Sequence, residues 1–368
     1  MIFWITNTLV VFFLSVIFSG FIIPQILLIA ARKQLYDVPD ERKIHTCAVP
    51  RLGGIAFEPV VFFSVAIVVG LNLALGKFEI LYGVVSELQQ IIFGYCSIIV
   101  LYLVGIADDL IGVRYRAKFI AQIVCAVMLI LGGLYFDNLH GILGINQLPL
   151  WFAYPFTVLI VVFIINAINL IDGIDGLASG LCSVAFLFFG LIFFHLNEYI
   201  FGLLSFATLG VLLPFFYYNV FGNPDRGRKI FMGDTGSLTI GIMICFMSLK
   251  LMQTSTLNEP NSFNPFVMAF APLIIPCFDV VRVYLHRVKN GKNPFLPDKN
   301  HIHHKLLAVG INQRQAMISI IVASILLTVC NICLSTYIDV NWLLLGNLLL
   351  WTVFNIVLTN KIMIHTEK

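Results

Sequence analysis

Four clusters of polar residues interrupt a chain of 368 residues that is otherwise strongly apolar. They combine carboxylates, amides, hydroxyls and histidines, the side chains that bind divalent cations and phosphate groups. Their members are Asp108 and Asp109; Asn166, Asn169, Asp172 and Asp175; Gly233, Asp234, Thr235, Gly236 and Ser237; and His301, His303 and His304. Each cluster falls at a predicted membrane boundary on the same side. Together they indicate a reaction centre at a lipid surface.

Asp108 and Asp109 close an apolar segment, where two adjacent carboxylates are costly unless they bind a cation, hold a proton or pair with a base. Arg114, Arg116 and Lys118 follow directly, so an ordinary acidic helix end with compensating bases explains the pair equally well. The pair is a candidate that needs support from the other clusters.

Asn166, Asn169, Asp172 and Asp175 recur every third residue at the end of another apolar segment. On an α-helix each step of three turns the chain by about 300°, so the first three side chains share an arc of about 120°. The glycines that follow the two aspartates allow the helix to break and bring Asp175 back to the same side. The alternative is a buried, hydrogen-bonded amide network, and the ladder favours a binding site over it.

The run Gly233–Ser237 places a carboxylate and hydroxyls between glycines just before a predicted helix. Glycine lets backbone amides approach a ligand closely, and a helix N-terminus attracts phosphate. Asp234 could then hold a metal ion that bridges to the phosphate. A capped helix after a glycine turn is the common structural alternative.

His301, His303 and His304 lie with neighbouring lysines in the longest polar loop. This combination suits a transition metal or a phosphate group. Thiolates are missing nearby and Asp298 is the nearest carboxylate, so phosphate binding is preferred over a zinc site. A solvated basic loop is the structural alternative.

Hydrophobic residues make up 60% of the chain and charged residues 11%, which is typical of a polytopic membrane protein. We expect an all-α fold with about eleven transmembrane helices, forming a single integral membrane catalytic domain over residues 1–368. The expected spans are 3–31, 53–76, 91–107, 119–136, 150–168, 177–196, 199–219, 238–253, 265–285, 315–337 and 341–359.

The basic residues predict the orientation of these spans. With the amino terminus outside, only Lys77 and Lys250 of the 22 Lys and Arg fall on the outer side. The other side then holds the segments 32–52, 108–118, 170–176, 220–237, 286–314 and the tail from 360. By the positive-inside pattern this side is the cytoplasm, so the carboxyl terminus and the four clusters are expected there.

Taken in order, these runs resemble the polyprenyl-phosphate N-acetylhexosamine-1-phosphate transferase superfamily, membrane enzymes that start bacterial cell-envelope glycans and eukaryotic N-glycans. The resemblance extends over nearly the whole chain. Its segments are 37–45, Pro50–Gly54, Asp108 and Asp109 with Lys118 and Phe119, the Asn/Asp ladder, Gly233–Ser237 and His301–His304. The sequence His-Ile-His-His after Pro-Phe-x-Pro-Asp looks like the branch that transfers N-acetylglucosamine-1-phosphate. Glu58, in the second span, departs from the apolar residues usual there.

The resemblance implies that undecaprenyl phosphate attacks the β-phosphate of UDP-N-acetylglucosamine, giving undecaprenyl-diphosphate-N-acetylglucosamine and UMP. The reaction would take place at the cytoplasmic face of the bacterial inner membrane and initiate a cell-envelope glycan. The implied cofactor is magnesium, with manganese as the alternative ion, held chiefly by Asp234 and secondly by Asn169. A homodimer is a candidate assembly, and no nucleic acid is expected as a partner.

The resemblance also implies roles for the other site residues. The catalytic set is Asp108, Asp109, Lys118 and Asp172, and the substrate-binding set is Asn166, Asp175, Arg282, His301, His303 and His304. Asp108 and Asp109 would deprotonate or orient the lipid phosphate, which Lys118 steadies. Because a phosphate monoester has a second pKa of about 6, a base at Asp108 stays an open question.

Three alternatives remain beside this interpretation. The same chemistry could use another UDP-N-acetylhexosamine or a phospho-N-acetylmuramoyl-pentapeptide donor, although the peptidoglycan branch carries a different histidine-rich loop. An ion-coupled transporter would place its polar residues near the bilayer midplane, whereas here they cluster at one edge. A membrane prenyltransferase would need two Asp-rich motifs with DxxxD-like spacing, and the chain has Asp-Asp and Asp-Gly-Ile-Asp instead.

Overall fold

The computed structural model describes residues 1–36, 49–253, 263–291 and 300–366. Throughout these ranges every regular element is a helix, and β-pairing is limited to isolated bridges such as that between Asn138 and Gln147, so the all-α prediction is confirmed. The segment 37–45 and the stretch 294–298 before the histidines lie outside the described residues.

Ten helical segments in the described part of the chain are long and apolar enough to cross a bilayer, which makes the protein a multi-pass membrane protein. They are α1 (Ile2–Lys33), η1 with α2 (Gly53–Ala56 and Phe57–Ala74), α4 (Leu88–Ile111), α6 (Leu150–Ile171), α7 (Leu177–His195), α8 (Tyr199–Phe221), α9 (Gly233–Gln253), α10 with η4 and α11 (Pro265–Phe270, Ala271–Leu273 and Ile274–Lys289), α13 (Gln313–Leu334) and α14 (Val340–Thr366). The short helices are α3 (Glu79–Ser86), η2 (Ile142–Gly144), η3 (Pro224–Arg226) and α12 (Ile302–Ala308).

The remaining helix, α5 (Tyr115–Leu131), corresponds to the span expected at 119–136. Its 17 residues cover about 25 Å, slightly less than the hydrocarbon core of a bilayer. It packs on α4 and α6, and its two ends lie level with the two ends of α9. Lys118 near its start lies 3.6 Å from Asp234 at the start of α9, and Gly133 beyond its end accepts a hydrogen bond from Gln253 at the end of α9. The total of eleven spans stays a prediction.

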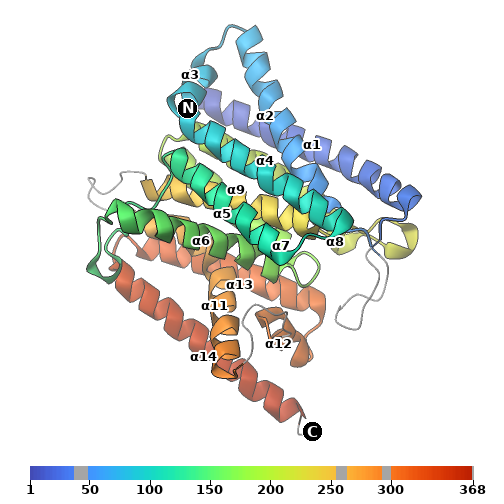
Figure 1. Ribbon diagram of the computed structural model, residues 1–368, viewed down its shortest axis with the longest axis vertical. Helices are drawn as coiled ribbons and strands as arrows, with labels where there is room; N and C mark the ends of the chain where they lie inside the picture. The colour runs from blue at the N-terminus through green and yellow to red at the C-terminus, as the bar shows by residue number, and fades with distance from the viewer. Residues whose placement is uncertain (37–48, 254–262, 292–299, 367–368) are drawn as a thin grey trace.

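Helix α9 forms the centre of the bundle (Figure 1). Every residue from Thr235 to Met252 is buried. Helices α4 and α6 pack directly on α9, while α8 packs against both α1 and α7. Helix α14 crosses the bundle obliquely at its edge and is the least buried of the ten candidate spans (Figure 1). From Thr235 onwards α9 is therefore enclosed by protein, while Gly233 and Asp234 at its start are partly exposed.

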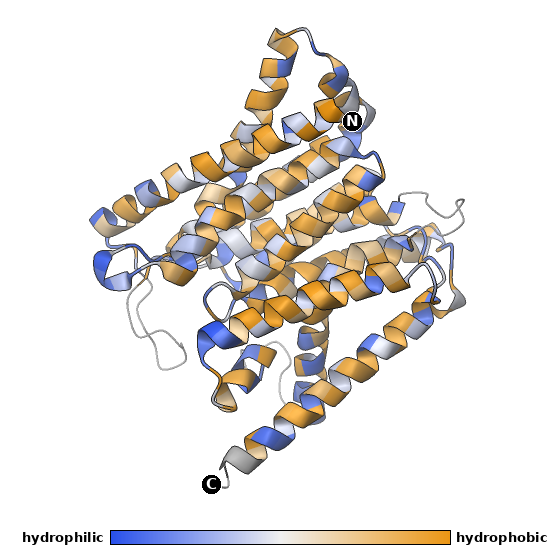
Figure 2. Cartoon of the chain, turned by 180° about the vertical axis from the view of Figure 1, so that it is seen from behind, coloured by the Kyte–Doolittle hydropathy of each residue, from blue (hydrophilic) through white to orange (hydrophobic). Residues whose placement is uncertain are grey.

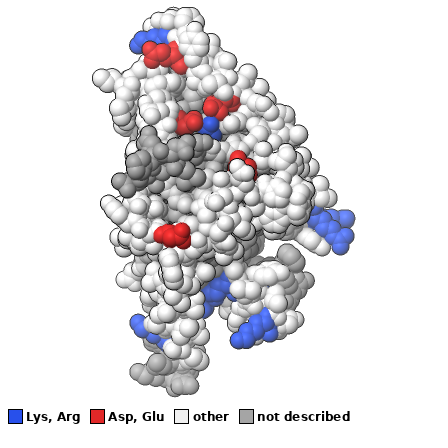
Figure 3. Space-filling model, turned by 90° about the vertical axis from the view of Figure 1, so that its left-hand side faces the viewer, with Lys and Arg blue, Asp and Glu red and all other residues white. Residues whose placement is uncertain are grey.

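The surface suits a surrounding bilayer. Apolar residues cover the lengths of the helices, while hydrophilic residues gather at helix ends and in connecting loops (Figure 2). Seen from the left-hand side of Figure 1, the surface is mostly uncharged and its charged side chains form a few small groups (Figure 3). Helices suit the hydrocarbon because most of their backbone groups bond to one another within the same segment.

Segments that are far apart in the chain meet at the end of the bundle where α4 ends and α9 begins. Phe231 N donates to Pro50 O at 2.9 Å, and Gly53 N donates back to Phe231 O at 3.0 Å. Gly54 N then donates to Met232 O at 2.9 Å. These bonds hold residues 50–54 alongside the segment that leads into α9.

Two glycines allow other backbones to reach the first turn of α9. A Cβ on Gly54 would lie 2.0 Å from Gly236 N, and a Cβ on Gly105 would lie 2.4 Å from Thr235 Cα. Since the opposing atoms belong to the backbone, they could not move aside as a flexible side chain does. η1 and α4 therefore fix this turn at close range.

Candidate active site

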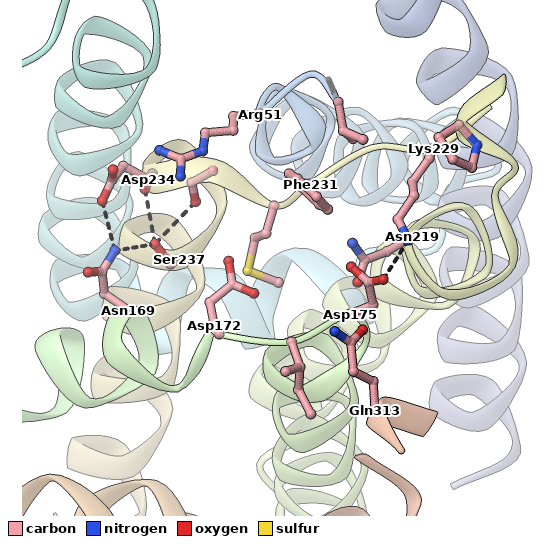
Figure 4. A pocket seen from close by; sticks show the side chains of 16 residues that line it. Arg51, Asn169, Asp172, Asp175, Asn219, Lys229, Phe231, Asp234, Ser237 and Gln313 are labelled. Atoms are coloured by element: carbon pink, nitrogen blue, oxygen red, sulfur yellow. Dashed lines mark hydrogen bonds and ion pairs between the residues drawn. The ribbon is translucent and has the colours of Figure 1, made fainter. Parts of the chain in front are cut away.

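A cleft of about 450 Å³ opens at this end of the bundle (Figure 4). It is formed by the segment before η1, the end of α6 with the following turn, and the segment that leads into α9. Its polar lining residues are Arg51, Asn169, Asp172, Asp175, Asn219, Lys229, Asp234, Ser237 and Gln313. The cleft therefore brings together residues from two of the predicted clusters.

Asp234 lies at one end of the cleft with partners from two other helices. Asn169 Nδ2 of α6 donates to Asp234 Oδ1 at 2.7 Å, and Lys118 Nζ of α5 lies 3.6 Å from the same oxygen. Asn169 also donates to Ser237 Oγ at 2.7 Å (Figure 4). The two predicted metal ligands are thus in direct contact, because α6 packs on α9 at this level.

Asp108 joins this group from the end of α4. Lys118 Nζ donates to Asp108 Oδ2 at 3.0 Å, and Val113 N donates to Asp108 Oδ1 at 2.6 Å. The carboxyl of Asp108 also lies within hydrogen-bonding range of Asp234. Two carboxylates at this separation need a proton or cations between them, and Lys118 supplies one positive charge.

Asp109 has a different environment from its neighbour. Its carboxylate accepts hydrogen bonds from Asp234 N at 2.8 Å, Thr235 N at 2.9 Å and Thr235 Oγ1 at 2.5 Å. The two N–H groups are backbone donors of the first turn of α9, which have no partners within the helix itself. Asp109 therefore caps α9 from a different helix, and within this pair Asp108 faces the side chains of Asp234 and Lys118.

Asp172 follows the last residue of α6 and lies between the Asp234 group and the pair formed by Asp175 and Lys229 (Figure 4). Its side chain is exposed to the cleft, although protein surrounds the cleft on several sides. This partial desolvation, followed by the negative charges of Asp234 and Asp175, raises the pKa of Asp172 to about 7, and Arg51 opposes the increase. Its carboxyl can therefore hold or release a proton near neutral pH.

The turn between α6 and α7, residues 172–176, returns Asp175 to the cleft. Gly176 has a φ of 78°, in the left-handed region that favours glycine, and α7 begins at the next residue. The predicted break of the helix at the glycines is confirmed. Gly176 N donates to Asn219 Oδ1 at 2.6 Å, and Lys229 Nζ donates to Asp175 Oδ2 at 2.5 Å. The end of the cleft away from Asp234 thus presents a carboxylate and an ammonium side by side.

Asn166 does not join the other members of its ladder. Its Nδ2 donates to Gln122 Oε1 of α5 and to Val162 O, both at 2.7 Å, and the residue does not line the cleft. In this structure it connects α5 to α6. Its predicted role in substrate binding stays a prediction that the geometry does not support.

The histidine run lies next to the 172–176 turn and does not line the cleft. His301 and His303 are buried, while His304 is partly exposed with its ring 4.2 Å from that of His303. Arg282 binds Asp279 at 2.8 Å and the backbone carbonyl of Asn300. The substrate binding expected of Arg282 and these histidines stays a prediction.

The residues at the Asp234 end suit a hard divalent cation. No group of three or more His, Cys, Asp or Glu within the described ranges is arranged to hold an ion by itself. Magnesium does not require such a group, because it binds one or two protein oxygens and completes its shell with water and substrate phosphates. The carboxylate of Asp234, which lines the open cleft beside Asn169, fits this preference.

Several residues of the site had no assigned role from the sequence. Arg51 lies in the matching segment Pro50–Gly54, and Lys229 is five residues before Asp234, so proximity to a motif was the available signal. Ser237 belongs to a predicted cluster without a role of its own. Gln313 at the start of α13 and Asp279 within α11 have no local pattern that separates them from ordinary polar residues.

Comparison with known proteins places these motifs in a family. Residues 91–252 match the sequence model of glycosyl transferase family 4, and this region contains α4 to α9 except the first three residues of α4 and the last residue of α9. The undecaprenyl-phosphate alpha-N-acetylglucosaminyl 1-phosphate transferase of Salmonella typhi is 32% identical over 85% of this chain and 82% of its own length. The chain belongs to glycosyl transferase family 4. Within this family, proteins of the same name from Yersinia pestis and Escherichia coli (strain K12) are 31% and 32% identical, over 83% and 81% of this chain and 78% and 76% of their lengths.

Membership confirms the resemblance to the polyprenyl-phosphate N-acetylhexosamine-1-phosphate transferases. The matched region of this family 4 transferase holds Asp108, Asn169, Asp172 and Asp234, while the histidine run lies beyond it. The protein is therefore a membrane phosphoglycosyltransferase whose matched region includes the polar core of the cleft.

Proposed function

We propose that this transferase moves N-acetylglucosamine-1-phosphate from UDP-N-acetylglucosamine to undecaprenyl phosphate, giving undecaprenyl-diphosphate-N-acetylglucosamine and UMP. The observation that carries the proposal is the contact between Asn169 and Asp234 in an open cleft, next to Asp108 and Lys118. The names of the relatives support the two substrates. The volume of the cleft lies within the range of small-molecule sites, about 300 to 1,000 Å³.

The reaction exchanges one phosphorus–oxygen bond for another. A phosphate oxygen of the lipid bonds to the β-phosphorus of the donor, and the bond from that phosphorus to the bridging oxygen breaks. UMP leaves with the bridging oxygen and its electron pair. Because the nucleophile already carries negative charge, catalysis depends mainly on positioning the two substrates and on neutralising the pyrophosphate.

Residues at the Asp234 end would position the phosphates. Magnesium, or manganese in its place, would be held by Asp234 and Asn169 and would neutralise negative charge on the pyrophosphate. Lys118 orients the carboxylates of Asp108 and Asp234 and offers an ammonium to the lipid phosphate. Arg51 adds a guanidinium at the edge of the cleft, suited to a second phosphate (Figure 4).

The other end of the cleft would bind the nucleotide. Asp175 and Lys229 provide an acceptor and a donor next to each other, which suits the alternating donors and acceptors of a uracil edge or a ribose. Asp172, between the two ends, can accept or return a proton near neutral pH. A lipid phosphate that is already dianionic has no proton to lose. Asp172 and Asp108 are therefore candidate bases only for lipid phosphate that is still a monoanion.

The proposed location follows the basic residues. The loops that form the cleft are those predicted to be cytoplasmic, so the site would lie on the cytoplasmic face of the bacterial inner membrane, where nucleotide sugars are made. The product would initiate a cell-envelope glycan. The alternative donors, another UDP-N-acetylhexosamine or phospho-N-acetylmuramoyl-pentapeptide attached to UDP, differ only in the sugar part.

One competition assay tests this proposal. Purified protein is given undecaprenyl phosphate, magnesium and an equimolar mixture of UDP-N-acetylglucosamine, UDP-N-acetylgalactosamine and UDP-N-acetylmuramoyl-pentapeptide, and the lipid products are identified by mass spectrometry. We expect undecaprenyl-diphosphate-N-acetylglucosamine as the main product, with UMP formed in equal amount. A different main sugar would replace the proposed donor. Release of UDP instead of UMP would contradict the reaction itself.

A further inference from the structure

Asp279 is a fully buried carboxylate of α11 that the proposed reaction does not use. His301 Nδ1 lies 2.8 Å from Asp279 Oδ2, while Ile302 N donates to Oδ1 at 3.0 Å and Arg282 Nη2 donates to Oδ1 at 2.8 Å. An ionised carboxylate only accepts hydrogen bonds, so Nδ1 of His301 carries a hydrogen. Asp279 therefore fixes the ring of His301 and the start of α12 together.

From His301 the contacts continue to the cleft wall. The rings of His301 and His303 are parallel within 4°, with centroids 5.8 Å apart. The ring of His303 rests on Gly173, where a Cβ would lie 2.2 Å from Nε2 of the histidine. Gly173 lines the cleft within the turn that carries Asp172 and Asp175. A continuous set of contacts thus joins Asp279 to this turn.

His303 would not occupy this position without being held there. It is 1% exposed, and neither ring nitrogen has a hydrogen-bond partner within the described ranges. Leaving such groups buried without partners costs free energy. Burial, followed by the positive charges of His304 and His301, lowers the pKa of His303 to about 3, so the ring is neutral at physiological pH. Its contact with Gly173 is therefore one of packing and not of charge.

We propose that Asp279 is a positioning residue for the donor site: through His301 and the backbone of Ile302 it holds His303 against Gly173, and so sets the turn that presents Asp172 and Asp175. This inference rests on the proposed function to the extent that this turn binds the UDP-sugar. Arg282 also helps to hold the start of α12 in place, because it binds both Asp279 and the backbone carbonyl of Asn300.

A kinetic experiment tests the role of Asp279. In Asp279→Asn the carboxylate that orients His301 is lost, while the size of the side chain is kept. We expect the KM for UDP-N-acetylglucosamine to rise about tenfold or more, as is typical when a residue behind a binding group is changed, and the KM for undecaprenyl phosphate to stay unchanged. Asp339→Asn, in an exposed loop at the other end of the bundle, is the matched control. A rise in both KM values, or in neither, would overturn the proposal.

A spectroscopic measurement on the same proteins does not depend on activity. With ¹⁵N-labelled histidine, wild-type His301 should be protonated at Nδ1, and its signal should shift in Asp279→Asn but not in Asp339→Asn. If the unaltered protein carries the His301 hydrogen only on Nε2, Asp279 does not orient the ring. This result would count against the inference even if the protein were inactive as a transferase, and the competition assay separately decides the proposed function.

The contact between His303 and Gly173 has a test of its own, based on thermal stability. Gly173→Ala introduces a methyl group where the ring now lies and should lower the Tm. Removing the ring in the double variant Gly173→Ala/His303→Ala should recover part of that loss, because the new methyl then has space. If the double variant is no more stable than the sum of the two single losses, the two residues are not coupled and the contact path is refuted.

Discussion

Asp108 and Asp109 show how adjacent residues of one type can do different work. On a helix, neighbouring side chains point about 100° apart, so the two carboxylates cannot face the same partner. Asp108 contacts Lys118 and the carboxyl of Asp234, whereas Asp109 accepts two backbone hydrogen bonds and one hydroxyl hydrogen bond from the start of α9. The catalytic role predicted for both residues therefore has geometric support at Asp108, while Asp109 positions Asp234.

The raised pKa of Asp172 leads to a prediction for stability without metal. The carboxyl has a pKa of about 7 in the folded protein and an ordinary value of 3.8. Below pH 3.8 it does not change the free energy of unfolding. Between the two values it lowers that free energy progressively as the pH rises, and above pH 7 the decrease is constant. Asp172→Asn removes this decrease. With a chelator present, we expect the variant to exceed the wild type in Tm at pH 8 by more than at pH 5, as measured by differential scanning fluorimetry.

Comparing the Tm difference between Asp172→Asn and the wild type at pH 5 and at pH 8 controls for other effects of the asparagine side chain. A change in packing or hydrogen bonding would shift the Tm by a similar amount at both. An equal difference at pH 5 and pH 8, or a variant less stable than the wild type at pH 8, would show that Asp172 is not held near its neutral form by its surroundings.

At the scale of elements, hydropathy predicts helices well because each must cover the bilayer with apolar residues. The span expected at 177–196 is α7 at Leu177–His195, and the break after α6 lies at the predicted glycines. The pairing of residues 50–54 with the segment before α9 could not be predicted, since it joins distant segments without a local pattern. For the same reason the sequence could not show that His303 packs against Gly173 in the cleft wall. The role of the histidines in substrate binding stays a prediction.

Close approach of backbones around the first turn of α9 gives a prediction at this scale. In Gly54→Ala and Gly105→Ala the new methyl group would lie 2.0 Å and 2.4 Å, respectively, from a backbone atom of α9. The turn that carries Asp234 must therefore move. Overpacking of this kind costs about 1 to 3 kcal/mol, and a shift of about 1 Å at a reacting group can lower the rate about a hundredfold. We expect both variants to release UMP about a hundredfold more slowly, while the amount of protein in the membrane stays normal.

Gly70→Ala is the control for this pair, because Gly70 lies in α2 with no other heavy atom within 4 Å of its would-be Cβ. It should keep its activity and gain slightly in helix stability. Activity in Gly54→Ala and Gly105→Ala equal to that of Gly70→Ala would mean that the first turn of α9 tolerates displacement.

At the scale of the molecule, the orientation argument had two exceptions, and the structure explains one of them. Lys250, at the end of α9 opposite the cleft, pairs with Glu87 at 3.1 Å and Glu198 at 3.4 Å, and its Nζ lies 4.7 Å from the centre of the Phe201 ring. Its charge is neutralised within the bundle and is no signal for topology. The sequence could not show this, because the two glutamates begin different helices.

This ion-pair group should contribute to the stability of the bundle. Lys250→Met keeps the length of the side chain and leaves two partly buried carboxylates without their cation. Breaking a buried pair in this way costs about 3 to 5 kcal/mol. We expect a clear decrease in the free energy of unfolding in detergent, while Lys77→Met, exposed at the same end, should change it little. Equal stability of the two variants would show that the group contributes nothing.

The central claim is that Asp234, with Asn169 and Lys118 beside it, neutralises the phosphates at which transfer takes place. Its most direct test is UMP release by Asp234→Ala, with UDP-N-acetylglucosamine, undecaprenyl phosphate and magnesium supplied, relative to Asp339→Ala at equal amounts of folded protein. We predict a loss of about a hundredfold or more in Asp234→Ala and full activity in the control. UMP release by Asp234→Ala at the rate of the control would contradict the account.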